Sequence, residues 1–180
     1  MAQNHRRDPI LEAYHLWNSN GWEDAAAGCT AVTSLMRVHQ MMTRRADQVL
    51  APLDLTFARY ELLVRLYFRD GSLPLSQLGK ELQIHQTSIT SLVDKLEKQG
   101  LIERTPHPTD RRSTIAQMTP AGRTLTGKAI NLLNAEFFRD LGLTDPEARL
   151  LIGLLMKIRV SWNDIENPAG WEPFGGDSAG

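Results

Sequence analysis

Two adjacent arginines beside an aspartate end the stretch "PHPTDRR", in which two prolines prevent a helix. A guanidinium group at an exposed loop tip can enter the narrow minor groove of duplex DNA, where negative potential attracts it, or bind a phosphate oxygen. A neighbouring carboxylate can orient such a group through a charge-assisted contact. We predict that Arg112 enters the groove, Arg111 contacts phosphate and Asp110 orients the adjacent arginine.

A second set of polar side chains lies on the helical pattern "QTSITSLVDKLEKQG". Its apolar residues recur at i, i+3, i+4 and i+7, which defines an inner face of Ile89, Leu92, Val93 and Leu96. The opposite face carries Thr87, Ser91, Asp94 and Lys98, flanked by Thr90 and Lys95. Short hydroxyl side chains let a helix approach the major groove, while lysines neutralise phosphates. From this face and the following strand we predict DNA contacts by Thr87, Ser88, Thr90, Ser91, Lys95, Lys98 and Arg104.

The elements that must position these groups are two short helices and a hairpin. "SQLGKELQI" directs Leu78, Leu82 and Ile84 toward a core, and the tight turn after it predicts a helix-turn-helix. Gly100 stands where a helix end commonly needs a left-handed residue. "LIERT" and "STIAQMT" alternate as strands do, so we expect a two-stranded hairpin with a basic tip.

Further helices are expected on both sides of this unit. "ILEAYHLW" indicates a short one, and an apolar stripe over 24–51 indicates a long one that stops at Pro52. "LTFARYELLVRLYF" indicates a third, ended by the turn residues "RDGSLP". After the hairpin, Thr119 and Pro120 are typical of a helix start, and a last helix from Thr144 has apolar stripes that need burial on more than one side.

Composition limits the class of protein. The chain has 180 residues and a formal net charge of -1, so a DNA-binding surface must come from local clustering of Lys and Arg. One cysteine cannot form an internal disulfide, and no apolar run approaches the roughly 18 residues needed to span a bilayer, which favours a cytoplasmic protein without a membrane partner. We expect four segments: N-terminal dimerisation helices 1–54, DNA-binding region 55–119, C-terminal dimerisation helices 120–164 and a flexible tail 165–180.

Three quoted stretches carry a family resemblance. "LTFARYELLVRL", "LSQLGKELQIHQTSITSLVDKLEKQGLIER" and "PTDRRSTIAQMTPAGR" together resemble the MarR family of bacterial transcription regulators. The resemblance implies a mainly α fold: a winged helix-turn-helix with long N- and C-terminal dimerisation helices and a two-stranded β-wing. It also implies a homodimer that binds an inverted repeat in double-stranded DNA, most often as a ligand-responsive repressor. Ser91 departs from the arginine that is frequent there, which argues against bidentate guanine readout by this residue.

The resemblance further implies a small-molecule pocket where the dimerisation helices meet the winged helix, often for aromatic acids. Aromatic and thioether side chains suit an apolar ligand, and an arginine suits a carboxylate. On that basis we predict a site for a small aromatic or acidic effector, with no bound cofactor. The predicted liners are Trp17, His39, Met42, Arg59 and Tyr60.

Three other functions were weighed against this interpretation. Cys29 could make the protein a redox-responsive regulator, although it precedes the position of the sensing cysteine in peroxide-responsive relatives by about one turn. The low net charge would suit a winged helix that binds proteins instead of DNA. An enzyme is not expected, because the five histidines show no metal-ligand spacing and the chain has no phosphate-binding glycine loop.

Overall fold

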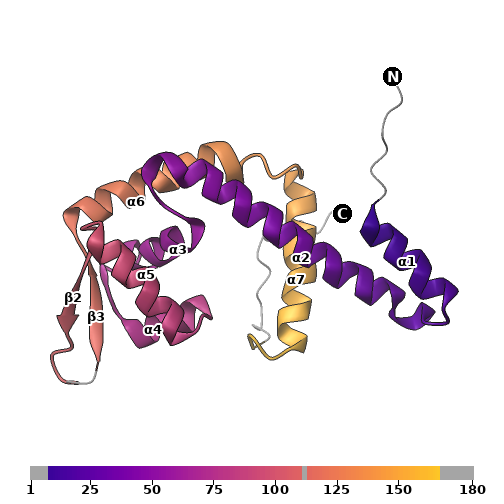
Figure 1. Cartoon of the computed structure of the whole chain (residues 1–180), viewed down its shortest axis with the longest axis horizontal. Coiled ribbons are helices and arrows are strands. Elements are labelled where there is room, and N and C mark those ends of the chain that lie inside the picture. The colour runs from indigo at the N-terminus through magenta and orange to yellow at the C-terminus, as the bar shows by residue number, and fades with distance from the viewer. Residues whose placement is uncertain (1–7, 111–112, 167–180) are drawn as a thin grey trace, which may run out of the picture. The chain divides into compact units, whose positions relative to one another are not determined.

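The protein is described by a computed structural model that covers residues 8–110 and 113–166. The chain divides into two compact units, Met1–Phe138 and Arg139–Gly180. The predicted mainly helical winged-helix fold is confirmed, and it lies within the first unit (Figure 1). Within the described residues, no helix combines the length and the apolar character that a membrane span requires.

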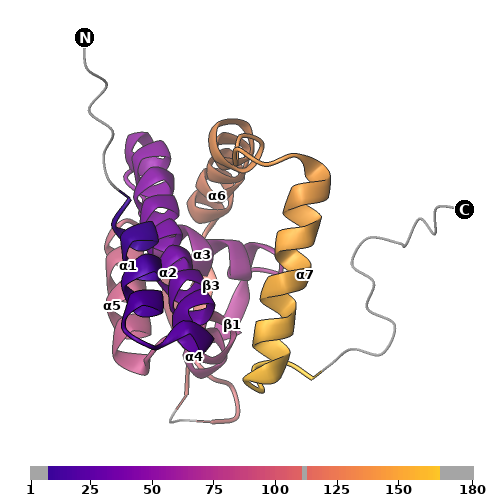
Figure 2. The ribbon, with the colours of Figure 1, turned by 90° about the vertical axis from the view of Figure 1, so that its right-hand side faces the viewer.

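Two helices open the first unit. The short helix α1 (Pro9–Ser19) begins at Asp8, whose carboxylate accepts a hydrogen bond from the Ile10 N–H, and it lies alongside the first part of α2 (Glu23–Leu50) (Figure 2). Both helices were predicted from periodicity. A single 3-10 turn, η1 (Ala51–Leu53), follows α2 at the proline that was expected to stop it.

The helix-turn-helix is formed as predicted. Its elements, with the helix that precedes them, are α3 (Phe57–Tyr67), α4 (Leu75–Leu82) and α5 (Gln86–Lys98). Gln83 links α4 to α5 with a left-handed backbone, φ 53°, and Gly100 has φ +69° just after α5, as its position predicted. Leu78 is fully buried, while Leu82 and Ile84 pack against the same core from partly exposed positions.

The wing contains one strand more than the sequence indicated. The sheet consists of β1 (Ser72–Pro74), β2 (Ile102–Pro106) and β3 (Thr114–Met118) in the order β1-β3-β2, all antiparallel. The expected hairpin is β2 with β3. The additional strand was interpreted as a turn because three residues are too short to show alternation; its buried Leu73 pairs with the buried Ala116.

Helix α6 (Pro120–Leu133) begins as predicted, with the Thr119 hydroxyl accepting from the Gly122 N–H at 3.0 Å. Gly122 packs directly against the Leu101 carbonyl, and no Cβ could be accommodated there. The expected helix over 120–138 differs in its last turn, which is a π-helix, η2 (Asn134–Phe138). Periodicity over five residues does not distinguish an i to i+5 turn from an α-helical one.

The second unit is built around α7 (Asp145–Ser161). Both the N–H and the hydroxyl of Thr144 donate to Glu147 Oε2, at 2.8 and 2.7 Å, and the two residues form a capping box at the start of the helix. The helix has no buried residue among those described. Large apolar side chains that stay exposed along it are Leu150, Ile152, Leu154, Ile158 and Trp162.

Candidate nucleic-acid interface

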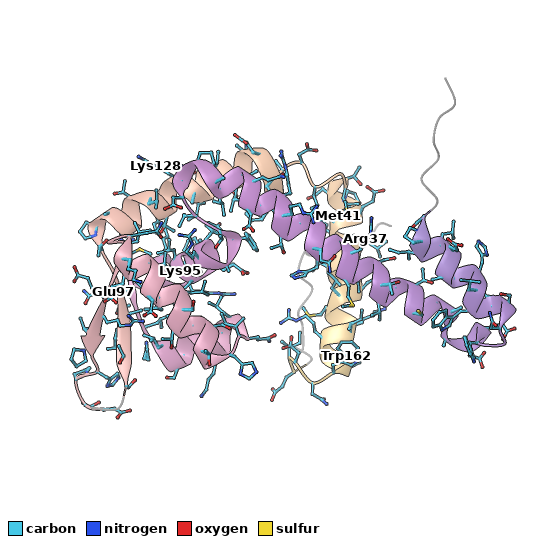
Figure 3. The ribbon with its side chains drawn as sticks, in the orientation of Figure 1. Arg37, Met41, Lys95, Glu97, Lys128 and Trp162 are labelled. Carbon is cyan, nitrogen blue, oxygen red and sulfur yellow. The ribbon has the colours of Figure 1, made fainter. Side chains whose placement is uncertain are left out.

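The two faces of α5 separate as the sequence predicts. Ile89, Val93 and Leu96 are 0% exposed, because this face packs into the core formed by α3, α4 and the sheet. Apart from Asp94, the side chains predicted to face the groove are exposed; these are Thr87, Ser88, Thr90, Ser91, Lys95 and Lys98. Figure 3 labels Lys95 on this helix. Six predicted DNA contacts are therefore presented together on one accessible helix, with hydroxyls toward its start and cations toward its end.

Asp94 differs from the prediction. It was placed on the groove-facing side, but its carboxylate accepts from Arg104 Nη2 at 2.5 Å, and Glu97 Oε2 accepts from Arg104 Nη1 at 2.6 Å. The backbone N–H of Arg104 also donates to Glu97 Oε1, at 3.2 Å. Glu97 lies on the side of α5 nearest the β2–β3 hairpin (Figure 3). Asp94 therefore belongs to the contact between α5 and the wing.

The same pairing bears on Arg104. Burial lowers the pKa of Arg104, but the hydrogen bonds and charges of Asp94 and Glu97 raise this pKa more, and the net direction is upward. Two carboxylates thus compensate one guanidinium, which fastens β2 to α5. A phosphate contact by Arg104 stays a prediction, and it would have to compete with these partners.

The wing tip is organised by a residue whose role was not foreseen. His107 Nδ1 accepts from the N–H of Asp110 at 3.2 Å, and the N–H of Thr109 lies 3.4 Å from the same nitrogen. Ser113 N–H donates to the Asp110 carbonyl at 2.9 Å, which closes the loop. A histidine just before a turn with prolines was the available signal. Arg111 and Arg112 lie outside the described residues, so their contacts and the orienting role of Asp110 stay predictions.

The start of α5 is formed by His85, a residue type that is uncommon at a helix N-cap. His85 occupies the N-cap position with φ -59° and ψ 146°, and it makes no side-chain capping hydrogen bond in the part of the chain that the structure describes. Its carbonyl accepts from the N–H groups of Ser88 and Ile89. The first amides of a helix carry partial positive charge, which favours anions near them.

The five residues predicted to line an effector site are not gathered within one protomer. Trp17 of α1 lies beside Trp22 at the beginning of α2, with the two rings tilted against each other and their centroids 5.5 Å apart. His39 lies about 25 Å farther along that helix, given the rise of ~1.5 Å per residue. It lines an open hollow of about 580 Å³, whose walls come from α2 and the first residue of η1.

The remaining three members of that set point inward. Met42 packs against the core, and Tyr60 is 7% exposed with its ring stacked on Phe57 at 5.8 Å. Arg59 Nη1 donates to Gln99 Oε1 at 2.9 Å, so this guanidinium already contacts the end of α5. Ligand contacts by the five residues stay a prediction.

Glu61 is a charged group beside His39 that was not in the predicted set. Burial raises the pKa of its carboxyl, while the charges of Arg65 and His39 lower it and oppose the shift in part. Burial also raises the pKa of Tyr60, and the charge of Glu61 adds to that shift. The α2–α3 surface therefore concentrates titratable groups around His39. Cys29, considered for redox sensing, is a half-exposed free cysteine near the start of α2.

Comparison with known proteins gives similarities over the same region. The MarR family model matches residues 55–114, from the turn before α3 into β3. The transcriptional regulator MhqR of Bacillus subtilis is 41% identical over 106 residues, which is 58% of this chain and 73% of that protein.

Two solved structures have a similar fold. Sco5413, a MarR family transcriptional regulator from Streptomyces coelicolor, has a TM-score of 0.71 and 36% identity, covering 77% of this chain and 97% of that one. A mutant of MarR from Escherichia coli, complexed with operator DNA, has a TM-score of 0.66 and 26% identity, covering 70% of this chain and 91% of that one. The helix-turn-helix and wing described above are thus found in a protein that was solved on DNA.

Proposed function

The chain belongs to the MarR family of transcriptional regulators, and from that premise we propose that it is a homodimeric repressor that binds an inverted-repeat operator and is released by a small molecule. It would act in the cytoplasm, where bacterial DNA is accessible. The observation that carries the proposal is the outer face of α5, where hydroxyl and lysine side chains are exposed while the opposite face is buried, fully at Ile89, Val93 and Leu96 and partly at Leu92.

The order of side chains along α5 suits a helix that enters the major groove with its first turns. Thr87 and Ser91 are one helical turn apart, and their short side chains permit close approach to base edges. Lys95 and Lys98 lie in the last turn, where long cationic side chains can reach phosphates at the groove edge. Specific contacts thus come from the first half of α5 and electrostatic attraction from the second.

Local charge explains how a chain with net charge -1 can bind a polyanion. Acidic side chains lie beside the groove-facing surface: Asp94 and Glu97, whose side chains are 48% and 39% exposed, share the one guanidinium of Arg104, which leaves one negative charge uncompensated. Lys95 and Lys98 outweigh that charge on the exposed face of α5, and in the proposal Arg111 and Arg112 at the wing tip add to them. The binding surface is basic although the whole chain is not.

Homodimer formation is supported by apolar side chains that one chain leaves exposed. Large exposed apolar surfaces on helices commonly mark an interface with another chain. On α2 they alternate with basic residues, as Arg37 and Met41 illustrate (Figure 3). The exposed apolar residues of this helix are Val32, Leu35, Met36, Val38 and Met41. Together with the apolar surface of α7, they would pair two copies, and two copies require two half-sites about one helical turn apart.

Selection of bound sequences from random double-stranded DNA tests this function. The purified full chain should enrich an inverted repeat and bind it in a gel shift at physiological salt. The double variant with Thr87→Ala and Ser91→Ala should lose enrichment, whereas Thr124→Ala, an equally exposed threonine on α6, should retain it. Absence of any enriched duplex would favour a protein-binding winged helix instead. Enrichment of a single asymmetric half-site would contradict the dimer.

The effector part of the proposal is tested on the same operator. The hollow beside His39 also contains Arg44, so it offers an aromatic surface and a cation to an aromatic carboxylate. Titration with a panel of benzoate derivatives should release the wild-type protein, and His39→Ala should raise the concentration needed. Equal release of both proteins would remove His39 from the site. Peroxide titration of Cys29→Ser beside the wild type distinguishes the redox alternative.

A further inference from the structure

Three side chains join the end of α5 to the turn between α2 and α3. Gln99 follows the last residue of α5 and uses both ends of its amide: Nε2 donates to the Asp54 carbonyl at 2.9 Å and to Asp54 Oδ2 at 2.8 Å. Its Oε1 accepts from Arg59 Nη1 at 2.9 Å. We refer to Asp54, Arg59 and Gln99 as the α5 clamp. Because the amide donates on one side and accepts on the other, only one orientation of it satisfies both neighbours.

Arg59 is held in place within the clamp. Its side chain is 14% exposed, its Nε lies 3.4 Å from Thr56 Oγ1, and its Nη2 lies 3.9 Å from Asp54 Oδ1. The planar guanidinium therefore contacts both Gln99 and the turn that precedes α3. The two contacts lie on opposite sides of the gap between α5 and that turn, which the guanidinium spans.

The turn itself is rigidly attached to α2. Asp54 has a left-handed backbone, φ 51°, and its N–H donates to the Ala51 carbonyl at 3.0 Å. Leu55, the next residue, is 3% exposed and anchors the turn in the core. Asp47 of α2 accepts from the Phe57 N–H at 2.6 Å, which caps the first turn of α3. Hydrogen bonds and burial thus connect the end of α2, the turn and the start of α3.

The clamp has leverage over the surface of α5 that faces DNA. The helix has 13 residues, so its first turn lies about 20 Å from Gln99 at ~1.5 Å per residue. The fully buried Val93 lies six residues from both Gln99 and Thr87, or about 9 Å from each at ~1.5 Å per residue. About that pivot, a displacement of the Gln99 end of α5 is matched by an equal and opposite displacement of the Thr87 end. A hydrogen bond tolerates only about 0.5 Å, so the clamp limits the movement of the first turn to a similar distance, while apolar packing is not directional and limits it less strictly.

We infer that Asp54, Arg59 and Gln99 are positioning residues that set the angle of α5 against α2, and through it the separation of the two recognition helices in the dimer. The inference rests on the proposed function, because α2 contributes to the dimer interface there. Its consequence is that the preferred distance between operator half-sites depends on residues that touch no base. Discrimination between spacings, more than affinity for one half-site, should respond to a change in the clamp.

Gln99→Met tests the inference, since it keeps the size of the side chain and removes all three hydrogen bonds. Dissociation constants are measured for the selected operator and for versions lengthened or shortened by one base pair. The spacing ratio is the dissociation constant for an operator of altered spacing divided by that for the native operator. It should fall by roughly fivefold to tenfold, the effect of losing one or two net hydrogen bonds. The salt dependence should not change, because no phosphate contact is lost. Gln117→Met, the same replacement at an exposed position of β3, should behave as wild type.

The outcomes separate the inference from the proposed function. If the spacing ratio of Gln99→Met equals that of the wild type, the positioning role of the clamp is overturned. A reduced slope of log K against log salt would assign Gln99 to a phosphate contact and overturn that role as well. If the wild type binds no duplex, the proposed function fails, and hydrogen exchange in the free protein decides on the clamp. Amides in the last turn of α5 should then exchange faster in Gln99→Met than in Gln117→Met; equal rates overturn the clamp.

A second variant covers the case in which Gln99→Met does not fold. Arg59→Lys keeps a donor for Gln99 but loses the planar group that also reaches the turn. By circular dichroism it should fold as the wild type does. Its ratio of dissociation constants for altered and native spacing should lie between those of the wild type and Gln99→Met. A ratio equal to that of the wild type overturns the role of Arg59.

Discussion

The winged helix and the flanking helices differ in how far they bury their large apolar side chains. In the winged helix, Leu63 and Leu78 are 0% exposed, whereas Leu150 on α7 is 65% exposed and Met41 on α2 is 61% exposed. A single chain therefore completes the core of its DNA-reading region but not the cover of its flanking helices. Under the proposed function, this difference means that one chain forms a complete DNA-reading region, whereas the exposed apolar surfaces of α2 and α7 would be covered by a second copy.

The largest effect is expected when a charged side chain is introduced into the exposed apolar surface of α7. Leu154 is 51% exposed on α7, and Leu154→Asp should convert the protein to a monomer in sedimentation, because an aspartate cannot be buried unpaired in an interface. Operator affinity should fall about 100-fold or more, since the second half-site is no longer bound intramolecularly. Phe68→Asp is the matched control: Phe68 is 71% exposed beside the winged helix, and the variant should stay dimeric.

Because the core of the winged helix is closely packed, adding a single methyl group to it should lower the stability of the fold. Gly122→Ala would place a methyl group against the Leu101 carbonyl, and such overpacking costs about 1–3 kcal/mol. We expect a lower midpoint in urea unfolding. Gly127→Ala, in the same helix, would place its methyl group 4.0 Å from the Tyr67 hydroxyl and should be neutral or stabilising by up to ~1 kcal/mol. Equal behaviour of the two variants would contradict the close packing at Gly122.

Within the DNA-reading region, Arg104 and Lys98 should behave differently. Arg104→Met frees Asp94 and Glu97 and loosens the wing, so operator affinity should fall by about tenfold, as for loss of one charge-assisted contact. The slope of log K against log salt should stay the same. Lys98→Met should lower the slope by nearly one unit, because it removes one phosphate contact. An altered slope in Arg104→Met would show that Arg104 itself reaches phosphate.

The smallest effect is expected at the start of α7. Hydrogen bonds from Thr144 lower the pKa of Glu147 from its usual 4.5. A carboxylate with a lowered pKa stabilises the fold above the usual value, and this contribution is lost as pH falls through the folded pKa. Glu147→Gln should therefore lower the thermal midpoint slightly at pH 7 and not at about pH 3. Glu136→Gln, an exposed glutamate in η2, serves as the control. A midpoint difference that is independent of pH would contradict the role of the charge.

Local features of the chain were predictable because they depend on residues near one another in sequence. The buried face of α5, the cap at Thr119 and the left-handed Gly100 each follow from spacing within one or two helical turns. The exposed face of α5 was predictable for the same reason, since an exposed face is the complement of a buried one, and its contacts with DNA stay a prediction. The MarR resemblance rested on motifs of the same local kind, and the comparisons confirm it.

Contacts between elements were decided by the tertiary structure. Nothing in the sequence pairs Gln99 with Asp54, or directs Asp94 toward the wing and away from the groove, because side chains on one helix acquire such partners only when another element is placed beside it. The three-residue strand β1 exists only through its pairing with β3. Periodicity reports which side of a helix is apolar, and it located the stripes of α2 and α7. What covers such a side depends on how separate elements pack, so only the fold showed that one chain leaves much of both stripes exposed.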